Sequence, residues 1–419
     1  MQLTFEYPPS KTHDKARMIF PEEWDVVSLG DVVQLGHGFA FSSEYFSDKG
    51  PILLTPGNFK LEGGLYFEAR NTKRFSGFFN KSMVLKGGDL VIVMTDLTPN
   101  CNLLGKPAFV SSDGIILHNQ RIGKVKFLGS KLLPKYLFYT LLSPIYLSKV
   151  KESATGSTVR HTSNKSIYKI KIPLPPIEEQ KAIAKALSDV DALINSLDQL
   201  IAKKRDIKQG AMQELLTGKT RLPGFDRSNG TFKQTDVGML PSDWECELVV
   251  HLAEISTGGK NTQDKVDDGQ FPFFVRSQKI ECINSYSFDG EAVLTAGDGV
   301  GTGKVFHYIN GKFDVHQRVY QITNFKNNVD GYFFFLYFSL HFYNRIMQMT
   351  AKSSVDSVRM DMIAKMPIPL PKQEEQKAIA QVLSDMDAEI QALEARRDKT
   401  KRLKQGMMQE LLTGRTRLL

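Results

Sequence analysis

The sequence PLPPIEEQKAIAKALSDVDALI, residues 173–194, returns as PLPKQEEQKAIAQVLSDMDAEI at residues 369–390. The copies are offset by 196 residues (369 − 173), and the same offset brings QELLTGKTRL (213–222) onto QELLTGRTRL (409–418) without a gap. Roughly 30 of about 50 positions are identical over this stretch, which establishes an internal duplication. The organisation of the rest of the chain follows from these two matched segments.

Each matched segment carries the signals of one long helix. In the first copy Pro176 stands at the entry, and Glu178 and Glu179 lie in the first turn, where the helix dipole favours carboxylates. The second copy does the same with Pro371, Glu374 and Glu375. Gly218 and Gly414 follow the last leucines of the two segments, and glycine is the usual residue in the left-handed position past a helix end.

Apolar residues recur in these helices at alternating intervals of four and three, as in the seam of a coiled coil. Both helices are acidic early and basic late, so an antiparallel pair sets each basic half beside the other's acidic half. Gly210 and Gly406 interrupt both helices at the same place, and a kink or a close approach of two helices would explain them. The residues expected to form the seam and to dock partners are Ile183, Leu187, Val190, Ile194, Leu197, Ile379, Leu383, Met386, Ile390 and Leu393.

The modules before the two helices have diverged and lack helical periodicity over most of their length. Short β-branched and aromatic runs alternate with Gly, Asn and Asp, which indicates a β-rich core with aromatic helices near its end. The predicted fold is α+β: two pseudo-two-fold-related β-rich modules with small helices, separated by two long helices that form an antiparallel coiled coil. The predicted boundaries are 1–171 and 223–367 for the modules, and 172–222 and 368–419 for the helical segments.

The composition is that of a globular protein with an anionic partner. The net charge is +8, which favours nucleic acid. The three cysteines form no CxxC or Cys/His cluster, so free thiols in a reducing cell are expected. The longest apolar run, residues 332–343, is too short to span a bilayer and is expected in the core. A cytoplasmic protein that does not interact with membranes follows.

No catalytic or metal-binding constellation stands out. The segment GDGVGTGK (297–304) lacks the spacing of a phosphate-binding loop and favours a tight hairpin turn. The Asn-Pro-Pro-aromatic tetrapeptide expected of an adenine methyltransferase is missing. His118 and His316 stand beside Gln and Arg rather than in a ligand pattern, as strand-end histidines with satisfied hydrogen bonds do. The sequence therefore predicts no catalytic residue, no metal and no cofactor in this chain.

Polar and basic residues recur at matching places in the two modules. Tyr136 aligns with Tyr332 at the offset of 196. At an offset of 197, one residue more, NQRI (119–122) aligns with HQRV (316–319). Arg can make bidentate contacts to guanine and Gln to adenine, and the loops before the long helices are rich in groups suited to phosphate. The candidate DNA-contact residues are Gln120, Arg121, Arg160, Lys106, Gln317, Arg318, Arg359 and Lys304.

Two variable modules, each followed by a helix with the same P-L-P…E-E-Q…L-L-T-G pattern, resemble the specificity subunit of type I restriction–modification systems over the whole chain. The resemblance implies a non-catalytic protein with two target-recognition domains, each reading one half of a split, asymmetric site in double-stranded DNA. The helices would fix the unread spacer and dock two methyltransferase subunits, which restriction subunits would join. S-adenosylmethionine and ATP would be used by those partners.

Three alternatives remain open from the residues alone. A coiled-coil scaffold without DNA contact would explain the helices but leave the two basic modules without a role. A stand-alone DNA methyltransferase would need the missing motifs. Within the family, the chain could serve a methyltransferase that has no restriction partner. The sequence specifies neither the bases read nor the spacer length.

Overall fold

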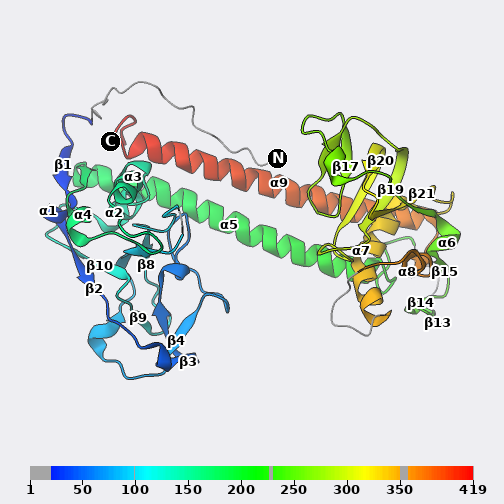
Figure 1. Ribbon diagram of the computed structural model, residues 1–419, viewed down its shortest axis with the longest axis horizontal. Helices are drawn as coiled ribbons and strands as arrows, with labels where there is room; N and C mark the ends of the chain where they lie inside the picture. Colours follow the sequence, from blue (N-terminus) through cyan, green and yellow to red (C-terminus); the bar gives the residue numbers. More distant parts are fainter. Residues whose placement is uncertain (1–19, 99, 226–229, 350–356, 419) are drawn as a thin grey trace. The chain divides into compact units, whose positions relative to one another are not determined.

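The computed structural model describes the chain from residue 20 to residue 418, except for residue 99 and the segments 226–229 and 350–356. The chain divides into two compact units, which are described separately below. Unit 1 comprises Met1–Ser196 and Arg397–Leu419, and unit 2 comprises Leu197–Arg396. Both divisions fall inside the two long helices, α5 (Ile177–Leu215) and α9 (Gln373–Leu411), so each unit contains part of both (Figure 1).

Unit 1 is built on two four-stranded sheets. One is antiparallel with the order β2-β10-β6-β8, and the other has the order β4-β3-β9-β5, in which β3 and β9 run parallel. The strands of unit 1 are β1 (Asp25–Ser28), β2 (Val33–His37), β3 (Phe46–Leu54), β4 (Lys73–Phe75), β5 (Val84–Leu85), β6 (Leu90–Val93), β7 (Thr95–Asp96), β8 (Pro107–Phe109), β9 (Ile116–His118), β10 (Ile122–Phe127), β11 (Arg160–His161) and β12 (Lys171–Leu174). Its short helices are α1 (Leu29–Val32), α2 (Pro134–Thr140), α3 (Pro144–Glu152) and α4 (Asn164–Tyr168).

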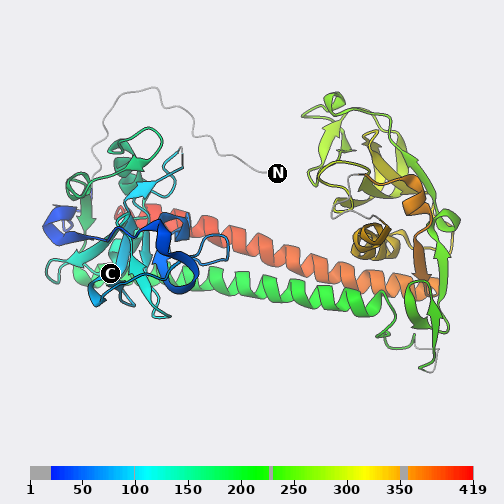
Figure 2. The ribbon, with the colours of Figure 1, turned by 60° about the horizontal axis from the view of Figure 1, so that its bottom comes forward.

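Unit 2 has one six-stranded sheet with the order β16-β21-β19-β20-β17-β18, in which β17 and β20 are parallel. Its strands are β13 (Phe232–Thr235), β14 (Gly238–Pro241), β15 (Glu245–Leu248), β16 (Glu254–Thr257), β17 (Phe271–Phe274), β18 (Glu281–Ile283), β19 (Phe288–Ala296), β20 (Phe306–Val315), β21 (Val319–Thr323) and β22 (Pro367–Leu370). Its shorter helices are α6 (Val249–Leu252), α7 (Gly331–Met349), seen nearly end-on in Figure 2, and α8 (Met360–Ala364).

The two units follow one plan with different lengths. The ladder β2-β10-β6-β8 of unit 1 corresponds to β16-β21-β19-β20 of unit 2. The long strand β20 takes the places of both β8 and β9, because it pairs with β19 from Phe306 to Phe313 and runs parallel to β17 at its last two residues. The α+β class and the two β-rich modules predicted from the sequence are confirmed.

Each unit has its own apolar core, which includes the start of one long helix and the end of the other. In unit 1, Ile183 and Leu187 of α5 are fully buried and share a core with Tyr136 of α2 and with Leu411 and Leu412 at the end of α9. The core of unit 2 contains the matching set, which is Ile379, Leu383, Phe333, Leu215 and Leu216. The apolar helix α7 is the core segment that its aromatic run predicted.

Within each unit the two helix segments run antiparallel, as charge patterning predicted. In unit 1 Lys404 of α9 contacts Asp191 of α5 at 2.6 Å, and in unit 2 Lys208 contacts Asp387 at the same distance. Both lysines lie in the stripe of seam positions. Polar pairs inside an apolar seam fix the register of a coiled coil. The ribbon shows the corresponding stretches of α5 and α9 side by side within each unit (Figures 1 and 2).

Removing one acid of these seam pairs tests their contribution. Asp387→Ala leaves the half-buried Lys208 without its carboxylate, and we expect the unfolding free energy of unit 2 to fall by about 1–2 kcal/mol. Asp385→Ala is the control, since this exposed acid accepts a hydrogen bond from Gln381 of its own helix. Chemical denaturation of both variants measures the difference, and equal stability of the two would contradict a structural role for the seam pair.

The Gln of the repeated Glu-Glu-Gln motif anchors the start of each long helix to the loop before α2 or α7. Gln180 is fully buried, accepts a hydrogen bond from the Leu133 amide and donates to the carbonyls of Lys131 and Pro175 at 2.8–2.9 Å. Gln376 makes the matching set to the amide of Asp330 and to the carbonyls of Asn328 and Pro371. Buried polar groups need such complete pairing, so this Gln is structural in both copies.

These bonds also correct the alignment of the two modules by one residue. Gln180 accepts from the amide of Leu133 and Gln376 from the amide of Asp330, so Leu133 and Asp330 are equivalent. Each directly precedes the first residue of its helix, α2 or α7. The buried Tyr136 therefore corresponds to Phe333 rather than to Tyr332, as the gap-free offset of 196 had predicted. Tyr332 instead stands at the place of Lys135.

The second Glu of the motif is the centre of a buried clamp. In unit 1 both oxygens of Glu179 accept from Arg417, at 2.6 and 2.9 Å, and one also accepts from the Trp24 indole at 2.9 Å. Burial alone would raise the pKa of Glu179, but the hydrogen bonds from Arg417 and Trp24 outweigh it and keep that pKa below its ordinary value. The arginine of the TRL sequence that ends one matched segment thus binds the glutamate at the start of the other long helix.

Unit 2 repeats this clamp with more contacts. Arg221 donates to Glu375 at 2.6 and 2.7 Å, to Asp243 at 2.9 Å and to the Phe225 carbonyl at 2.6 Å. Trp244 donates to Glu375 at 3.2 Å, and the Arg221 guanidinium lies 5.4 Å from the centre of its ring. The clamp of unit 2 is the more deeply buried of the two, with an arginine side chain only 8% exposed.

The helix glycines divide into two kinds. Gly218 and Gly414 have φ of +68° and +71°, which confirms the left-handed helix ends expected from the sequence. Gly210 and Gly406 lie inside continuous helices, and a Cβ built at either would meet no atom within 4 Å among the described residues. Of the two explanations that the sequence offered for these glycines, a kink or a close helix–helix approach, the close approach is therefore wrong.

Candidate nucleic-acid interface

Gln120-Arg121 and Gln317-Arg318 form the same two-residue turn in the two units. The first joins β9 to β10 and the second joins β20 to β21. All four residues are exposed. In both turns the amide of the Gln donates to a carbonyl just beyond a neighbouring strand, Phe39 after β2 at 2.9 Å and Lys260 after β16 at 2.8 Å. The matching places predicted from the sequence are present, and their contact with DNA stays a prediction.

A buried acceptor before each turn fixes its shape. Oδ1 of Asn119 accepts from the amide of Arg121 at 3.0 Å, and Nδ1 of His316 accepts from the amide of Arg318 at 3.0 Å. Asn119 and His316 are 8% and 5% exposed. Because an amide can only donate, this nitrogen of His316 must be deprotonated. Two different residues thus hold the same backbone geometry.

Burial and the nearby Arg276 guanidinium lower the pKa of His316, which makes its turn sensitive to acid. A histidine with a lowered folded-state pKa contributes stability above its unfolded pKa of about 6.5 and loses that contribution as the pH falls through the folded value. We expect up to about 1 kcal/mol to be lost between pH 7 and pH 5, the size of one hydrogen bond.

The variant His316→Asn, which copies Asn119 of unit 1, should remove this part of the pH dependence. Melting temperatures of wild type and variant across this range measure the difference. The other histidines with lowered pKa values, His118, His307 and His341, are common to both proteins and cancel. Parallel pH profiles for the two proteins would contradict the expectation.

The segment 297–304 is a hairpin turn between β19 and β20, as the sequence predicted. At its start Asp298 lies between two arginines: Nη1 of Arg276 is 2.9 Å from Oδ1, and Nε of Arg318 is 3.6 Å from Oδ2. This pairing holds Arg318 beside the turn while its side chain stays 63% exposed. The sequence argument missed Arg276, since it lies 42 residues before Arg318 and has no basic counterpart in the repeat.

Lys106 and Lys304 take equivalent places but differ in environment. Each follows a left-handed glycine that packs on a helix, Gly105 on α3 and Gly303 on α7. Lys106 is half-buried, and burial together with the nearby Lys151 lowers its pKa. Lys304 is exposed, with Nζ 5.4 Å from the centre of the Tyr343 ring. Lys304 is thus the better placed of the two for a phosphate contact.

Arg160 and Arg359 do not take equivalent places. Arg160 lies half-buried in β11, opposite Asp96 of β7. Its Nε is buried without a hydrogen-bond partner among the described residues. Arg359 is exposed at the N-cap of α8, with Nε 3.7 Å from Asp361. Of the loop KSSVDSVRMD, residues 352–356 lie outside the part that the structure describes.

The predicted seam residues are placed in the interior. Seven of the ten are buried, namely Ile183, Leu187, Ile194, Leu197, Ile379, Leu383 and Ile390, and Val190, Met386 and Leu393 are half-buried. A side chain that is buried within its own chain offers no surface to another subunit. A docking surface on these helices must therefore consist of their exposed residues, and docking itself stays a prediction.

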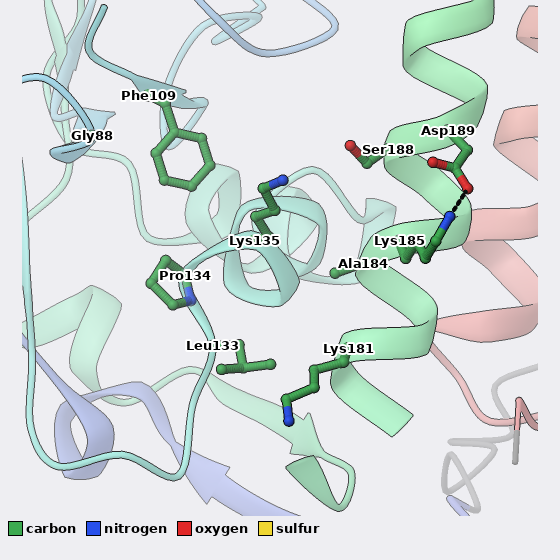
Figure 3. A pocket seen from close by; sticks show the side chains of 10 residues that line it. All are labelled: Gly88, Phe109, Leu133, Pro134, Lys135, Lys181, Ala184, Lys185, Ser188 and Asp189. Atoms are coloured by element: carbon green, nitrogen blue, oxygen red, sulfur yellow. Dashed lines mark hydrogen bonds and ion pairs between the residues drawn. The ribbon is translucent and has the colours of Figure 1, made fainter. Parts of the chain in front are cut away.

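A groove of about 610 Å³ opens on the exposed side of α5 in unit 1 (Figure 3). Apolar side chains from β8 and from the loop before α2 face lysines and small residues of α5 across it. Its lining consists of Gly88, Phe109, Leu133, Pro134, Lys135, Lys181, Ala184, Lys185, Ser188 and Asp189. In unit 2 the place of Lys135 is taken by Tyr332, whose ring packs on Tyr308 and Phe335 with centroids 5.0 and 5.7 Å away.

Neither a metal site nor a membrane span is found in the described part of the chain. Its residues contain no group of three or more His, Cys, Asp or Glu placed to hold a metal ion. None of its helices combines the length and apolarity that a bilayer crossing requires. The cysteines Cys101, Cys246 and Cys282 are free thiols, as the sequence led us to expect.

The repeated units, each with a polar turn and an α+β core closed by a long helix, define a duplicated protein. The model of the type I restriction modification DNA specificity domain matches it twice, at residues 21–204 and 241–402. These matches cover more than half of the 419 residues, and the chain belongs to this family.

Two curated relatives agree with this assignment, one over nearly the whole chain and one over part of it. The chain is 27% identical over 430 residues to the type I restriction enzyme MjaVIII specificity subunit of Methanocaldococcus jannaschii, covering 95% of this chain and 94% of that protein. It is 31% identical over 179 residues to the EcoDI specificity subunit of Escherichia coli, covering 42% of this chain and 38% of that protein.

Solved structures show the same fold at low identity. The S subunit of a type I restriction–modification system from M. genitalium superposes with a TM-score of 0.60 at 13% identity, covering 93% of this chain and 96% of that chain. A chain from a study of complex assembly and conformational transition in a type I system gives 0.52 at 17% identity, covering 94% and 98%.

Proposed function

We propose that this chain is the non-catalytic DNA-specificity subunit of a type I restriction–modification complex in the cytoplasm. Unit 1 and unit 2 each read one half of a split, asymmetric site in double-stranded DNA. The observation that carries the proposal is the exposed Gln-Arg turn, which recurs on the same backbone in two otherwise diverged units. Gln and Arg are side chains suited to base-edge contacts in the major groove.

The surroundings of the turns supply the rest of a DNA interface. Arg276 and Arg318 both pair with Asp298 beside the turn of unit 2, the exposed Lys304 lies at the end of the hairpin 297–304, and the chain carries a net charge of +8. Such charge provides the phosphate contacts that dominate affinity and make it depend on salt. The side chains around the common turn differ between the two units. This favours recognition of two different half-sites over recognition of a palindrome, in which both half-sites have the same sequence.

The remaining activities belong to partners in this proposal. Two methyltransferase subunits dock on the long helices and use S-adenosylmethionine, and restriction subunits that use ATP join the complex. The long helices set the number of unread base pairs between the half-sites. The closely similar sequences of the two helical segments support this, because two copies of one partner need two similar surfaces.

The groove on α5 is the docking feature best suited to a test. Its apolar floor and its lysines at Lys135, Lys181 and Lys185 fit an apolar side chain flanked by acids. Lys135→Glu reverses one charge of this groove in unit 1 and has no counterpart in unit 2, where Tyr332 takes this place. We expect it to weaken binding of one methyltransferase subunit about tenfold and leave the second bound, as native mass spectrometry can count. Lys149→Glu on α3, outside the groove, is the control.

The function is tested by co-expressing the chain with the methyltransferase subunit of its own system and mapping adenine methylation genome-wide. We expect methylation at one motif with two short defined halves around a fixed gap. A soluble complex that methylates no such motif would contradict the proposal and favour a coiled-coil scaffold without DNA readout.

A further inference from the structure

Backbone hydrogen bonds show which residues are equivalent in the two loops that lie beside the Gln-Arg turns, one loop in each unit. In unit 1 the amide of Met94 donates to the carbonyl of Arg121 at 2.9 Å. In unit 2 the amide of Gly297 donates to the carbonyl of Arg318 at 2.8 Å. Since Arg121 and Arg318 hold the same position in their turns, Met94 and Gly297 correspond.

A second pair of hydrogen bonds confirms this register. The carbonyl of Met94 accepts from the amide of Thr162 at 3.1 Å, and the carbonyl of Gly297 accepts from Val358 at 2.7 Å. Thr162 and Val358 both precede the N-cap residue of the short helix in their unit, α4 or α8. Each loop is therefore held between the turn and this helix in the same way.

Three residues further along, each loop presents an exposed apolar side chain. Counting from Met94 and Gly297 leads to Leu97 and Val300, which are 62% and 101% exposed. A single exposed apolar residue is ordinary on a protein surface. Two of them at one register position, in modules that share few other loop residues, are harder to ascribe to chance.

The loop of unit 2 holds Val300 in an ordered turn. Thr302 is buried, and both its amide and its hydroxyl donate to the carbonyl of Gly299, at 3.0 and 2.6 Å. The amide of Val305 closes the next turn onto Gly301 at 3.0 Å. Val300 is thus displayed at the tip by a fixed backbone, so little conformational entropy is lost when a ligand covers it.

The charges around this tip indicate what covers it. Asp298, two residues before Val300, is bridged to Arg276 and Arg318, and the exposed Lys304 lies four residues after it. An apolar residue on a hairpin that also carries cations fits a polyanion with exposed apolar groups. Duplex DNA has this character in the major groove, where the thymine C5-methyl group lies between base edges and is contacted by small apolar side chains.

We propose that Leu97 and Val300 are specificity-determining residues, each packing on a thymine methyl group in the half-site of its own unit. The inference rests on the proposed function and deepens it, because it assigns one A·T pair in each half-site to a named side chain. The Gln-Arg turn then reads neighbouring base edges from the same end of the sheet.

The test uses the complete complex with the methyltransferase subunit and duplexes carrying the motif found by methylation mapping. Each thymine of the half-site of unit 2 is replaced in turn by uracil, which lacks only the methyl group. For the wild-type chain we expect one position at which uracil weakens binding about fourfold, the value of one buried methyl group. For Val300→Ser this difference should vanish.

Val250→Ser is the matched control, since Val250 is an exposed valine on α6 of the same unit, and it should keep the fourfold difference. Leu97→Ser should lose discrimination only in the other half-site. A Val300→Ser complex that still distinguishes thymine from uracil as the wild type does, or a half-site with no such thymine, overturns the inference. Failure of the wild-type complex to bind the mapped motif would instead count against the proposed function.

Discussion

Arg221→Met is expected to lower the unfolding free energy of unit 2 by about 3–5 kcal/mol, because it leaves the buried carboxylate of Glu375 without its cation. The Glu375 side chain is 3% exposed and receives two hydrogen bonds from Arg221. Asp243 and the carbonyl of Phe225 lose a donor as well. Methionine keeps much of the aliphatic volume over Trp244, so the loss reports mainly on charge and hydrogen bonding.

Hydrogen exchange measured by mass spectrometry resolves this effect, because peptides from unit 1 and unit 2 are followed separately in one sample. We expect faster exchange in unit 2 and little change in unit 1. The control is Arg205→Met, which removes a largely exposed ion pair with Glu394 and should cost less than about 1 kcal/mol. Similar effects from Arg221→Met and Arg205→Met would show that the clamp is not a main source of stability.

The twin variant Arg417→Met provides a second comparison, now in unit 1. Its side chain is 24% exposed, against 8% for Arg221, and it pairs with Glu179 and the exposed Glu23. We expect the same kind of loss, confined to unit 1 and smaller than for Arg221→Met. The repeated motif would then have the same role twice, with a strength set by burial.

The long helices could be predicted from the sequence because their signals are local. The four-three spacing of apolar residues, the acids of the first turn and the terminal glycines all lie within one helix length, and both helices begin and end close to the expected residues. The same signals gave Glu179 only a helix-dipole role. Its actual partners, Trp24 and Arg417, lie 155 and 238 residues away, beyond the reach of any local pattern.

The recognition loops were harder to predict because their lengths differ. Equivalent residues of the two long helices are 196 positions apart in the sequence. Those of the Gln-Arg turns are 197 apart, and Leu97 and Val300 are 203 apart. Insertions in surface loops are tolerated at little cost, so such offsets drift. Backbone hydrogen bonds show which loop residues are equivalent. Arg276, Leu97 and Val300 could therefore be identified only from the structure.

Replacing both Gln317 and Arg318 by alanine is expected to weaken DNA binding by the complete complex about 100-fold or more. Each bidentate base contact is worth about 1–3 kcal/mol of discrimination, and this change removes two candidates from one turn. Because both residues are exposed and the turn is held by backbone bonds and by His316, the fold of unit 2 should be retained. Methylation mapping should show relaxed bases in one half-site and the other half-site unchanged.

The double variant of the equivalent turn, Gln120 and Arg121 to alanine, is the mirror experiment and should relax only the opposite half-site. Arg205→Ala serves as the charge control for the Gln317 and Arg318 variant, since it removes one exposed cation from the part of α5 in unit 2 without touching the turn. It should reduce affinity slightly at all sequences and leave the motif intact. If either turn variant relaxes both half-sites, or neither does, the turns are not the separate readers that their matched geometry indicates.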